Sequence, residues 1–401
     1  MAIIQQFLTE KLQAKIAEKL IDDTTFRRQQ RSGTIWQFMP IQTYNTEDFV
    51  YYVTETVNAV ASIVAKGAPI PTSGYGGFGK INVNALRVGK GHLFDTLAQE
   101  QMQKVMNEAM YKGVGVISGV DPGTGKIISV NDALVNYLFG SVKSVVNGVM
   151  DKFQQMAVES VAYGSVTLNN DPLTKGTAVL NFRETEQPYD ALHFPATLTD
   201  TGNTADRRLN RWTDYANADG IGMIEQMCLD YVDTNGFLPD AIWMSNRACV
   251  HLRNQEATIH KARQAAGLAQ VGSVGVAMLK EIMSNNNLPP IVTAGADETY
   301  DVETTTPTTT NTRSNFVNRA RFLNENRIVF LKEGVGELGM GITMEMRNIK
   351  QEDGRISNEN SAVMVRVYEK SKIPMSDEIV SLAAGCPIVP IARRMAARTV
   401  F

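Results

Sequence analysis

Residues 119 to 128, with the sequence GVDPGTGKII, come close to a phosphate-binding loop. Such a loop has a glycine, four further residues and then Gly-Lys-Ser/Thr, because its amides hold phosphates and its hydroxyl binds magnesium. Here Val120 stands at the position of the first glycine and Ile127 at that of the hydroxyl, and an apolar side chain cannot bind the metal. The flanking apolar segments favour strands, so we interpret residues 121 to 123, Asp-Pro-Gly, as a turn joining two strands.

Two further segments match the Gly-x-Gly-x-x-Gly pattern of dinucleotide-binding domains, at residues 74 to 79 and 334 to 339. The first follows a proline-rich segment and precedes a strand-like one, whereas the motif requires a strand before it and a helix after it. The second follows an apolar strand-like segment, and Glu352 and Asp353 lie near the position of the ribose-binding acid. However, too little chain remains after it for a dinucleotide domain. A nucleotide-binding enzyme therefore stays a less favoured alternative.

The remaining candidates for catalysis or metal binding have the wrong spacing. Residues 272 to 275, GSVG, lack the Gly-x-Ser-x-Gly spacing of a hydrolase nucleophile. His251 and His260 are nine residues apart, which is not the i, i+4 spacing of a metal-binding pair on a helix. The three cysteines are widely separated, so free thiols are expected instead of disulfides or a zinc site. We predict no catalytic residue, no cofactor and no metal site.

The composition is that of a chain with a substantial core and little net charge. Its 401 residues are 43% apolar, and this length corresponds to about two or three domain-sized units. The 39 Lys and Arg residues nearly balance the 42 Asp and Glu residues, which argues against a protein that mainly wraps nucleic acid. No segment reaches the roughly 18 to 20 apolar residues of a membrane span, and no signal-peptide pattern is present. We therefore expect a cytoplasmic protein without membrane contact.

Three helices are predicted in the first half of the chain, with strand-like segments between residues 36 and 94. Residues 1 to 21 form an amphipathic arm, and residues 95 to 112 have a capping box and a glycine stop. Residues 131 to 163 have apolar side chains every three or four positions, and Gly164 follows. At 1.5 Å per residue, this last helix would be about 50 Å long. Its predicted apolar face contains Val135, Leu138, Val142, Val149 and Phe153.

Beyond residue 170, helix-like and strand-like segments alternate, which predicts a mixed α+β fold. Residues 299 to 315, TYDVETTTPTTTNTRSN, are polar and of low complexity, so we expect an exposed loop there. The other expected elements are helices at residues 217 to 236 and from Asn246, and strands at residues 240 to 245, 289 to 295, 326 to 333 and 362 to 372.

The order of these parts resembles the HK97-fold major capsid proteins of tailed bacteriophages, and within them the lambda-type family of major capsid protein E. The resemblance extends from about residue 35 to residue 390, and it depends on the order of moderately specific segments. The leading helix, the 119–128 hairpin and the Thr-rich insertion depart from it. The segments that carry it are residues 51 to 95, 131 to 163, 209 to 227, 236 to 253, 322 to 341 and 365 to 390.

The resemblance implies a domain organisation for the HK97-like fold. It implies an N-terminal arm at residues 1 to 48, an extended loop at 49 to 94, a peripheral domain at 95 to 209 with the spine helix 131 to 163, an axial domain at 210 to 385 with the insertion 299 to 315, and a tail at 386 to 401. In that family the extended loop lies over the adjacent subunit. The loop residues predicted to contact a neighbour are Gly67, Pro69, Pro71, Tyr75, Phe78, Lys80 and Arg87.

The function that the resemblance implies is that of a major capsid protein without catalysis. Copies would assemble in the host cytoplasm into hexamers and pentamers of an icosahedral head around double-stranded DNA, contacting the DNA without sequence specificity. Scaffolding and portal proteins are expected partners, and a decoration protein is a further candidate. The alternative within the same fold is an encapsulin-like compartment that encloses enzyme cargo.

Overall fold

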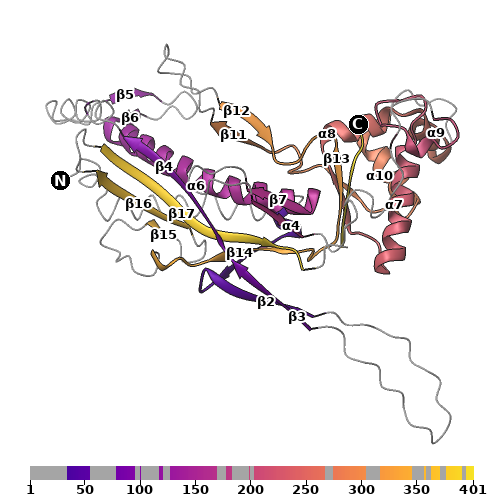
Figure 1. The fold of residues 1–401 in the computed structure, drawn as a ribbon. Coiled ribbons are helices and arrows are strands. Elements are labelled where there is room, and N and C mark those ends of the chain that lie inside the picture. Colours follow the sequence, from indigo (N-terminus) through magenta and orange to yellow (C-terminus); the bar gives the residue numbers. More distant parts are fainter. Residues whose placement is uncertain are drawn as a thin grey trace, which may run out of the picture.

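In the computed structural model of the protein, helices and sheets combine into a mixed α+β fold (Figure 1). The predicted fold class is therefore confirmed. Among the described residues, no helix is both long enough and apolar enough to cross a membrane. The described residues are 34–54, 78–94, 100, 117–120, 127–168, 178–182, 198, 203–266, 274–303, 317–345, 356–357, 363–370, 376–390 and 394–401.

One long helix, α6 (Val130–Tyr163), runs along a six-stranded sheet (Figure 1). Its 34 residues confirm the helix predicted from the apolar spacing, and Gly164 ends it in the left-handed conformation with φ of 63°. Strand β17 is the centre of the sheet, because it pairs with β4, β14 and β16. The strands are β1 (Ile41–Tyr44), β4 (Leu86–Phe94), β14 (Glu337–Gly341), β15 (Ile356–Ser357), β16 (Val363–Lys370) and β17 (Ser376–Ile388).

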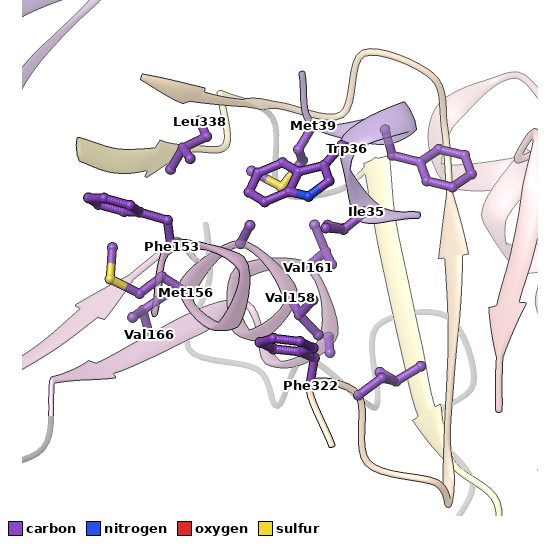
Figure 2. Close-up of a cluster of buried hydrophobic side chains, with 14 of the residues drawn as sticks. Ile35, Trp36, Met39, Phe153, Met156, Val158, Val161, Val166, Phe322 and Leu338 are labelled. Carbon is purple, nitrogen blue, oxygen red and sulfur yellow. The ribbon is translucent and has the colours of Figure 1, made fainter. Parts of the chain in front are cut away.

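The first hydrophobic core lies between α6, this sheet and the short helix α4 (Ile35–Phe38). In Figure 2, Trp36 and Met39 lie on the side of α6 that also carries Phe153, and Phe322 lies on its other side. Phe153, Met39 and Ile35 are fully buried. The periodic apolar residues of α6 thus pack on elements from both ends of the chain.

A second sheet of four strands lies beside four helices at the other end of the molecule (Figure 1). Asp219 caps the first of these helices by accepting a hydrogen bond from the amide of Gly222 at 2.9 Å, and Gly236 ends it with φ of 78°. The elements are α7 (Gly220–Asn235), α8 (Asn246–Asn254), α9 (Glu256–Ala266), α10 (Val276–Asn285), and, in sheet order, β10 (Ile291–Val292), β9 (Ala241–Met244), β13 (Arg327–Leu331) and β18 (Met395–Thr399).

The four-stranded sheet separates the two cores and is buried on both faces. Successive side chains of a strand point to opposite faces. Accordingly, Val329 and Leu331 of β13 belong to the first core, whereas Ile328 and Phe330 belong to a second core formed with α7 to α10. Burial on both faces explains why this strand is a continuous apolar run instead of an alternating one.

The remaining elements are short. The turn predicted within residues 119 to 128 is flanked by two strands that pair antiparallel, as expected. The helices expected at residues 1 to 21 and 95 to 112 lie outside the described residues, except for Glu100. These short elements are β5 (Ile117–Val120), β6 (Ile127–Ser129), β7 (Ser165–Leu168), β8 (Ala178–Asn181) and the 3-10 helix η3 (Arg207–Leu209).

We expected an exposed loop over residues 299 to 315, and this was wrong for the first five of these residues, which form a strand. Thr299–Glu303 forms strand β11, which pairs with β12 (Val317–Arg321), and residues 304 to 316 lie outside the described part. The physical reason is Tyr300, whose ring packs on that of Phe322 with centroids 4.9 Å apart. One aromatic contact with the body offsets the polar composition of this segment.

The proposed domain boundaries stay predictions, but the chain crosses between the two cores more often than they imply. Strand β17 runs through the boundary at residue 385, and it packs with α6 in the first core. The C-terminal residues 395 to 399 form β18, an edge strand of the four-stranded sheet. Each core is therefore built from several separate stretches of sequence.

Candidate functional site

A two-stranded ribbon projects from the body of the molecule, away from α6 (Figure 1). Strand β2 (Asp48–Thr54) pairs antiparallel with β3 (Phe78–Asn84) over seven residue pairs. Within the described ranges, the two strands pair only with each other. Tyr52 is 57% exposed, although the apolar ring of a tyrosine usually packs against other residues. The ribbon thus presents strand edges and an aromatic side chain to its surroundings, which makes it the candidate site of interaction.

The root of the ribbon is fixed by a small hydrophobic cluster. Phe49 and Val83, which face each other across the ribbon, pack with Cys386 and Ile388 at the end of β17. The ring of Tyr44 stacks on Phe49 with centroids 3.9 Å apart and planes 3° from parallel. The Tyr44 hydroxyl also donates a hydrogen bond to Glu337 of β14. Burial, reinforced by this carboxylate, raises the Tyr44 pKa well above its ordinary value.

Glycines of the 334–341 segment allow the ribbon root to approach β14 closely. A Cβ atom on Gly339 would lie 2.5 Å from the ring of Phe49, and one on Gly341 would lie 2.5 Å from the backbone oxygen of Thr46. Gly334 adopts a positive φ of 69°, as a turn before a strand requires. The sequence match to a dinucleotide motif therefore lies in a turn and a strand, whereas the motif has to open a helix whose first amides bind a pyrophosphate.

Arg87 holds three segments together beside the root. Its guanidinium donates to both carboxylate oxygens of Glu47, at 2.9 and 2.8 Å, and to Glu345 at 2.9 Å. The hydrogen bonds to Glu47 contribute most to raising the Arg87 pKa. The pKa of Glu345 is lowered, first by a backbone hydrogen bond and also by the Arg87 charge. We call Arg87, Glu47 and Glu345 the root clasp; it joins β4, the β1–β2 turn and the segment after β14.

We expect Arg87→Ala to loosen the ribbon root without unfolding the protein, because the ion pairs that it removes are solvent-exposed. Hydrogen exchange, corrected for intrinsic rates, should become faster at the amides of residues 46 to 48 and 342 to 345. Arg208→Ala, which removes a comparable exposed pair with Asp206, is the matched control and should leave these amides unchanged.

The pH dependence of this effect follows from the lowered Glu345 pKa. A carboxylate whose pKa is lowered on folding stabilises the fold above its ordinary pKa, here 4.5, and loses that contribution as the pH falls through the folded value. The exchange difference between the wild type and Arg87→Ala should therefore be full at neutral pH and shrink below about pH 4.5. A difference that stays constant into the acid range would contradict the role given to the clasp.

The structure places the sequence-predicted residues in different situations. Val149 and Phe153 of α6 are buried in the first core, as the apolar face predicted. Arg87 makes ion pairs within the chain, and its predicted contact with a neighbour stays a prediction. The side chains of Val135, Leu138 and Val142 on α6, and of Phe78 and Lys80 on β3, lie outside the described residues, as do Gly67, Pro69, Pro71 and Tyr75 entirely.

Sequence reasoning missed the residues that anchor the ribbon. Glu47 and Glu345 were not singled out, because isolated acidic residues near strand ends are common. The glycine spacing of β14 was compared with a dinucleotide-binding motif, which was disfavoured, and with a glycine turn of the resembling family, but not with a close contact of the backbone. A glycine-rich strand is itself a signal of close backbone approach, and this signal could have pointed to the root.

The described residues contain little that could serve covalent or metal chemistry. Within the described ranges, no three His, Cys, Asp or Glu side chains gather as a metal site. Cys228, Cys249 and Cys386 are free and buried, and burial raises the pKa values of Cys228 and Cys386 to about 12 and about 11. The Tyr215 hydroxyl shares a hydrogen bond of 2.8 Å with Nδ1 of His251, whose pKa is lowered by burial and by Arg247.

The comparison with solved structures shows which fold this is. The chain superposes with a TM-score of 0.52 and 11% identity on a protein assigned as a prophage capsid protein, from E. coli CFT073, covering 97% of this chain and 99% of the other. A phage-related protein from Bordetella bronchiseptica RB50 gives a TM-score of 0.47 at 11% identity, with 96% of each chain covered. The chain from Mycobacterium phage Adephagia gives 0.39 at 10% identity, covering 92% and 90%.

The likeness to the protein assigned as a prophage capsid protein, at a TM-score of 0.52, confirms the predicted capsid fold. No family model and no curated protein matches the sequence itself. The narrower assignment to the lambda-type family of major capsid protein E therefore stays a prediction.

Proposed function

We propose that this chain is the major capsid protein of a tailed double-stranded DNA bacteriophage. The observation that carries the proposal is the shared fold with the protein assigned as a prophage capsid protein, which extends over 97% of this chain. Because sequence identity is only 11%, the proposal needs support from the physical features of this chain as well.

Those features suit a subunit that is completed by its neighbours. The β2–β3 ribbon projects from the body, and its root is fixed by packing, close glycine contacts and the root clasp. A rigid root keeps a projecting arm oriented, so less conformational freedom is lost when the arm binds a second subunit. The residues from Gly67 to Gly91 would then lie over the adjacent subunit of a hexamer or pentamer.

The other parts of the proposal concern the whole particle. The helices of the second core would surround the capsomer axis, and α6 with its sheet would meet other capsomers at the local threefold positions. A net charge of −3 suits a shell that contacts packaged DNA without binding it tightly. Scaffolding and portal proteins, and a decoration protein in addition, are the partners to be sought during assembly in the host cytoplasm.

The contents of purified particles test this proposal. The protein should be expressed with the rest of its phage's head genes, and the particles examined by negative-stain electron microscopy. We expect closed icosahedral shells that protect double-stranded DNA from nuclease. Shells that instead enclose a protein cargo would favour the compartment alternative. Saturable nucleotide binding that is lost in Lys126→Ala or Gly336→Ala would favour the enzyme alternative.

A further inference from the structure

A groove of about 500 Å³ opens between the C-terminal half of α6 and the β11–β12 hairpin. None of the residues that line the groove belongs to the hydrophobic cluster of the ribbon root. Its walls are joined by a hydrogen bond of 2.5 Å from Gln154 of α6 to Glu298, just before β11. The groove is lined by Gln155, Glu159, Tyr163, Tyr300, Arg321, Phe322, Asn324 and Glu325.

Three aromatic rings form the walls of this groove. Tyr300 and Phe322 pack with ring centroids 4.9 Å apart, and Tyr163 lies on α6. The ring of Tyr163 already holds a guanidinium, that of Arg327, whose central carbon lies 4.4 Å from the ring centroid. Aromatic faces attract cations, and the attraction is strongest where water is partly excluded. The walls therefore suit a cationic side chain.

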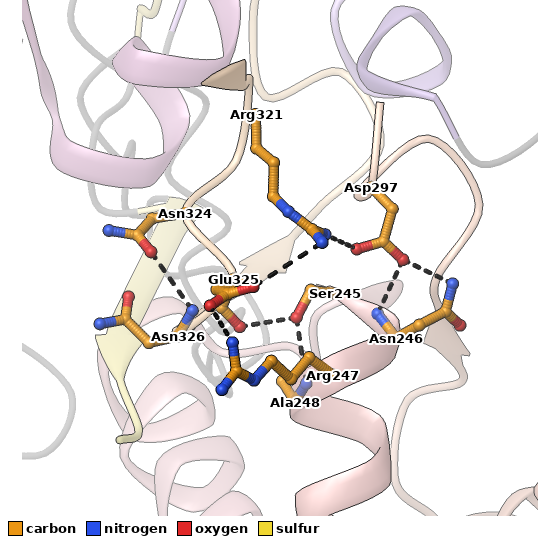
Figure 3. Close-up of polar contacts among 9 residues, drawn as sticks. All are labelled: Ser245, Asn246, Arg247, Ala248, Asp297, Arg321, Asn324, Glu325 and Asn326. Carbon is orange, nitrogen blue, oxygen red and sulfur yellow. Dashed lines mark hydrogen bonds and ion pairs between the residues drawn. The ribbon is translucent and has the colours of Figure 1, made fainter. Parts of the chain in front are cut away.

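The two carboxylates that line the groove differ in whether a basic side chain pairs with them. Glu325 is paired with Arg247 and Arg321, and Arg321 is bound in addition by Asp297 (Figure 3). Glu159, by contrast, contacts no basic side chain among the described residues; its carboxylate accepts a hydrogen bond from the amide of Gln155 at 2.8 Å. Within the described part of the chain, one carboxylate of the groove thus has no basic side chain as its partner.

Glu159 and Tyr300 line the same groove. The pKa of Tyr300 is raised, mainly by burial and further by the negative charge of Glu159. A negative charge beside partly buried aromatic rings repels phosphates and carboxylates and attracts ammonium or guanidinium groups. This chemistry favours a cationic group over a phosphate as the occupant.

We propose that this groove binds an arginine or lysine side chain of a second copy of the chain, with Glu159 as its ionic partner. The choice of a second copy rests on the proposed function, because the molecules packed around each subunit of a shell are copies of it. Of the 401 residues, 39 are Lys or Arg, so each copy carries many candidate side chains. The resulting contact would be separate from that of the ribbon.

A charge-reversal series tests the contact. Sedimentation velocity of the purified full-length protein, over a range of concentrations, should give the concentration at half association. We expect Glu159→Lys to raise this concentration about tenfold or more, and Glu159→Gln to raise it less, because an unpaired or repelled charge at an interface weakens binding. Glu281→Lys is the matched control on the exposed surface of α10 and should behave as the wild type.

Photo-crosslinking identifies the occupant of the groove. It does not depend on the Glu159→Lys variant, so it still tests the contact if that variant does not fold. A benzoylphenylalanine at Gln155, in a mixture of light and heavy isotope-labelled protein, should cross-link light to heavy chains at a peptide containing Lys or Arg. Wild-type association that Glu159 variants leave unchanged, or cross-links to another protein or within one chain, would overturn the inference and leave the proposed function standing. If the purified wild type does not associate, the same cross-linking is carried out in particles formed with the other head genes, where closed shells without the light-to-heavy cross-link would overturn the inference and leave the proposed function standing.

Discussion

Gly341→Ala should lower the thermal unfolding temperature by several degrees and prevent assembly. A Cβ atom there would lie 2.5 Å from the backbone oxygen of Thr46 and 2.7 Å from the Cα atom of Glu47. Both are backbone atoms, so the β1–β2 turn itself has to move, and overpacking of this kind costs about 1–3 kcal/mol or more. The moved turn would misdirect the ribbon that follows it. Calorimetry and electron microscopy of the variant measure the two effects.

The control for this substitution is another glycine of the same sheet. A Cβ atom on Gly89 of β4 would have as its nearest contact the backbone oxygen of Ser381, at 3.4 Å. Because that is an ordinary contact distance, Gly89→Ala should unfold near the wild-type temperature. If Gly341→Ala also unfolded at the wild-type temperature and assembled normally, the close contact at the root would have no structural importance.

Phe153→Ala should be the most destabilising change. Phe153 is fully buried in the C-terminal half of α6, and its ring would lie 2.9 Å from a Cβ atom on Gly385 of β17. Removing such a ring leaves a cavity between helix and sheet and costs about 3–5 kcal/mol. In denaturant unfolding, the first core of the variant should unfold at a lower denaturant concentration than that of the wild type.

An exposed apolar residue provides the comparison for Phe153. Leu229 on α7 is 61% exposed, so Leu229→Ala should change the free energy of unfolding by less than about 0.5 kcal/mol. Equal effects of the two substitutions would mean that α6 does not pack on the sheet in solution as described.

The elements that could be predicted from sequence are those specified by local patterns. The apolar spacing of α6 and the left-handed Gly164 after it fixed the helix within one residue. The glycine stop at Gly236 likewise marked the end of α7, which was predicted over residues 217 to 236 and begins at Gly220. In both cases, the signal and the structure that it specifies lie within a few turns of the same helix.

The contacts of the ribbon root could not be predicted, because they join residues that are far apart in the chain. Tyr44 meets Glu337, and Arg87 meets Glu345, across most of the sequence. Strand β1 pairs parallel to β14, a pairing without a local turn signal. A single sequence offers periodicity and caps, but it contains no direct record of such pairings.

The groove beside α6 could not be predicted from the sequence either. Tyr300 lies in a segment whose threonines predicted a loop, and Glu159 appears in the sequence as one more polar residue of an amphipathic helix. Only the fold brings both residues into one groove. The chemistry of that groove therefore emerges from tertiary structure alone.

The central claim is that copies of this chain complete one another in a closed shell. Cryo-electron microscopy of particles that contain the protein tests it most directly. We expect an icosahedral wall into which this fold fits, with the β2–β3 ribbon extended over the adjacent subunit. A wall built from a different protein, or particles in which the ribbon folds back on its own subunit, would contradict the account.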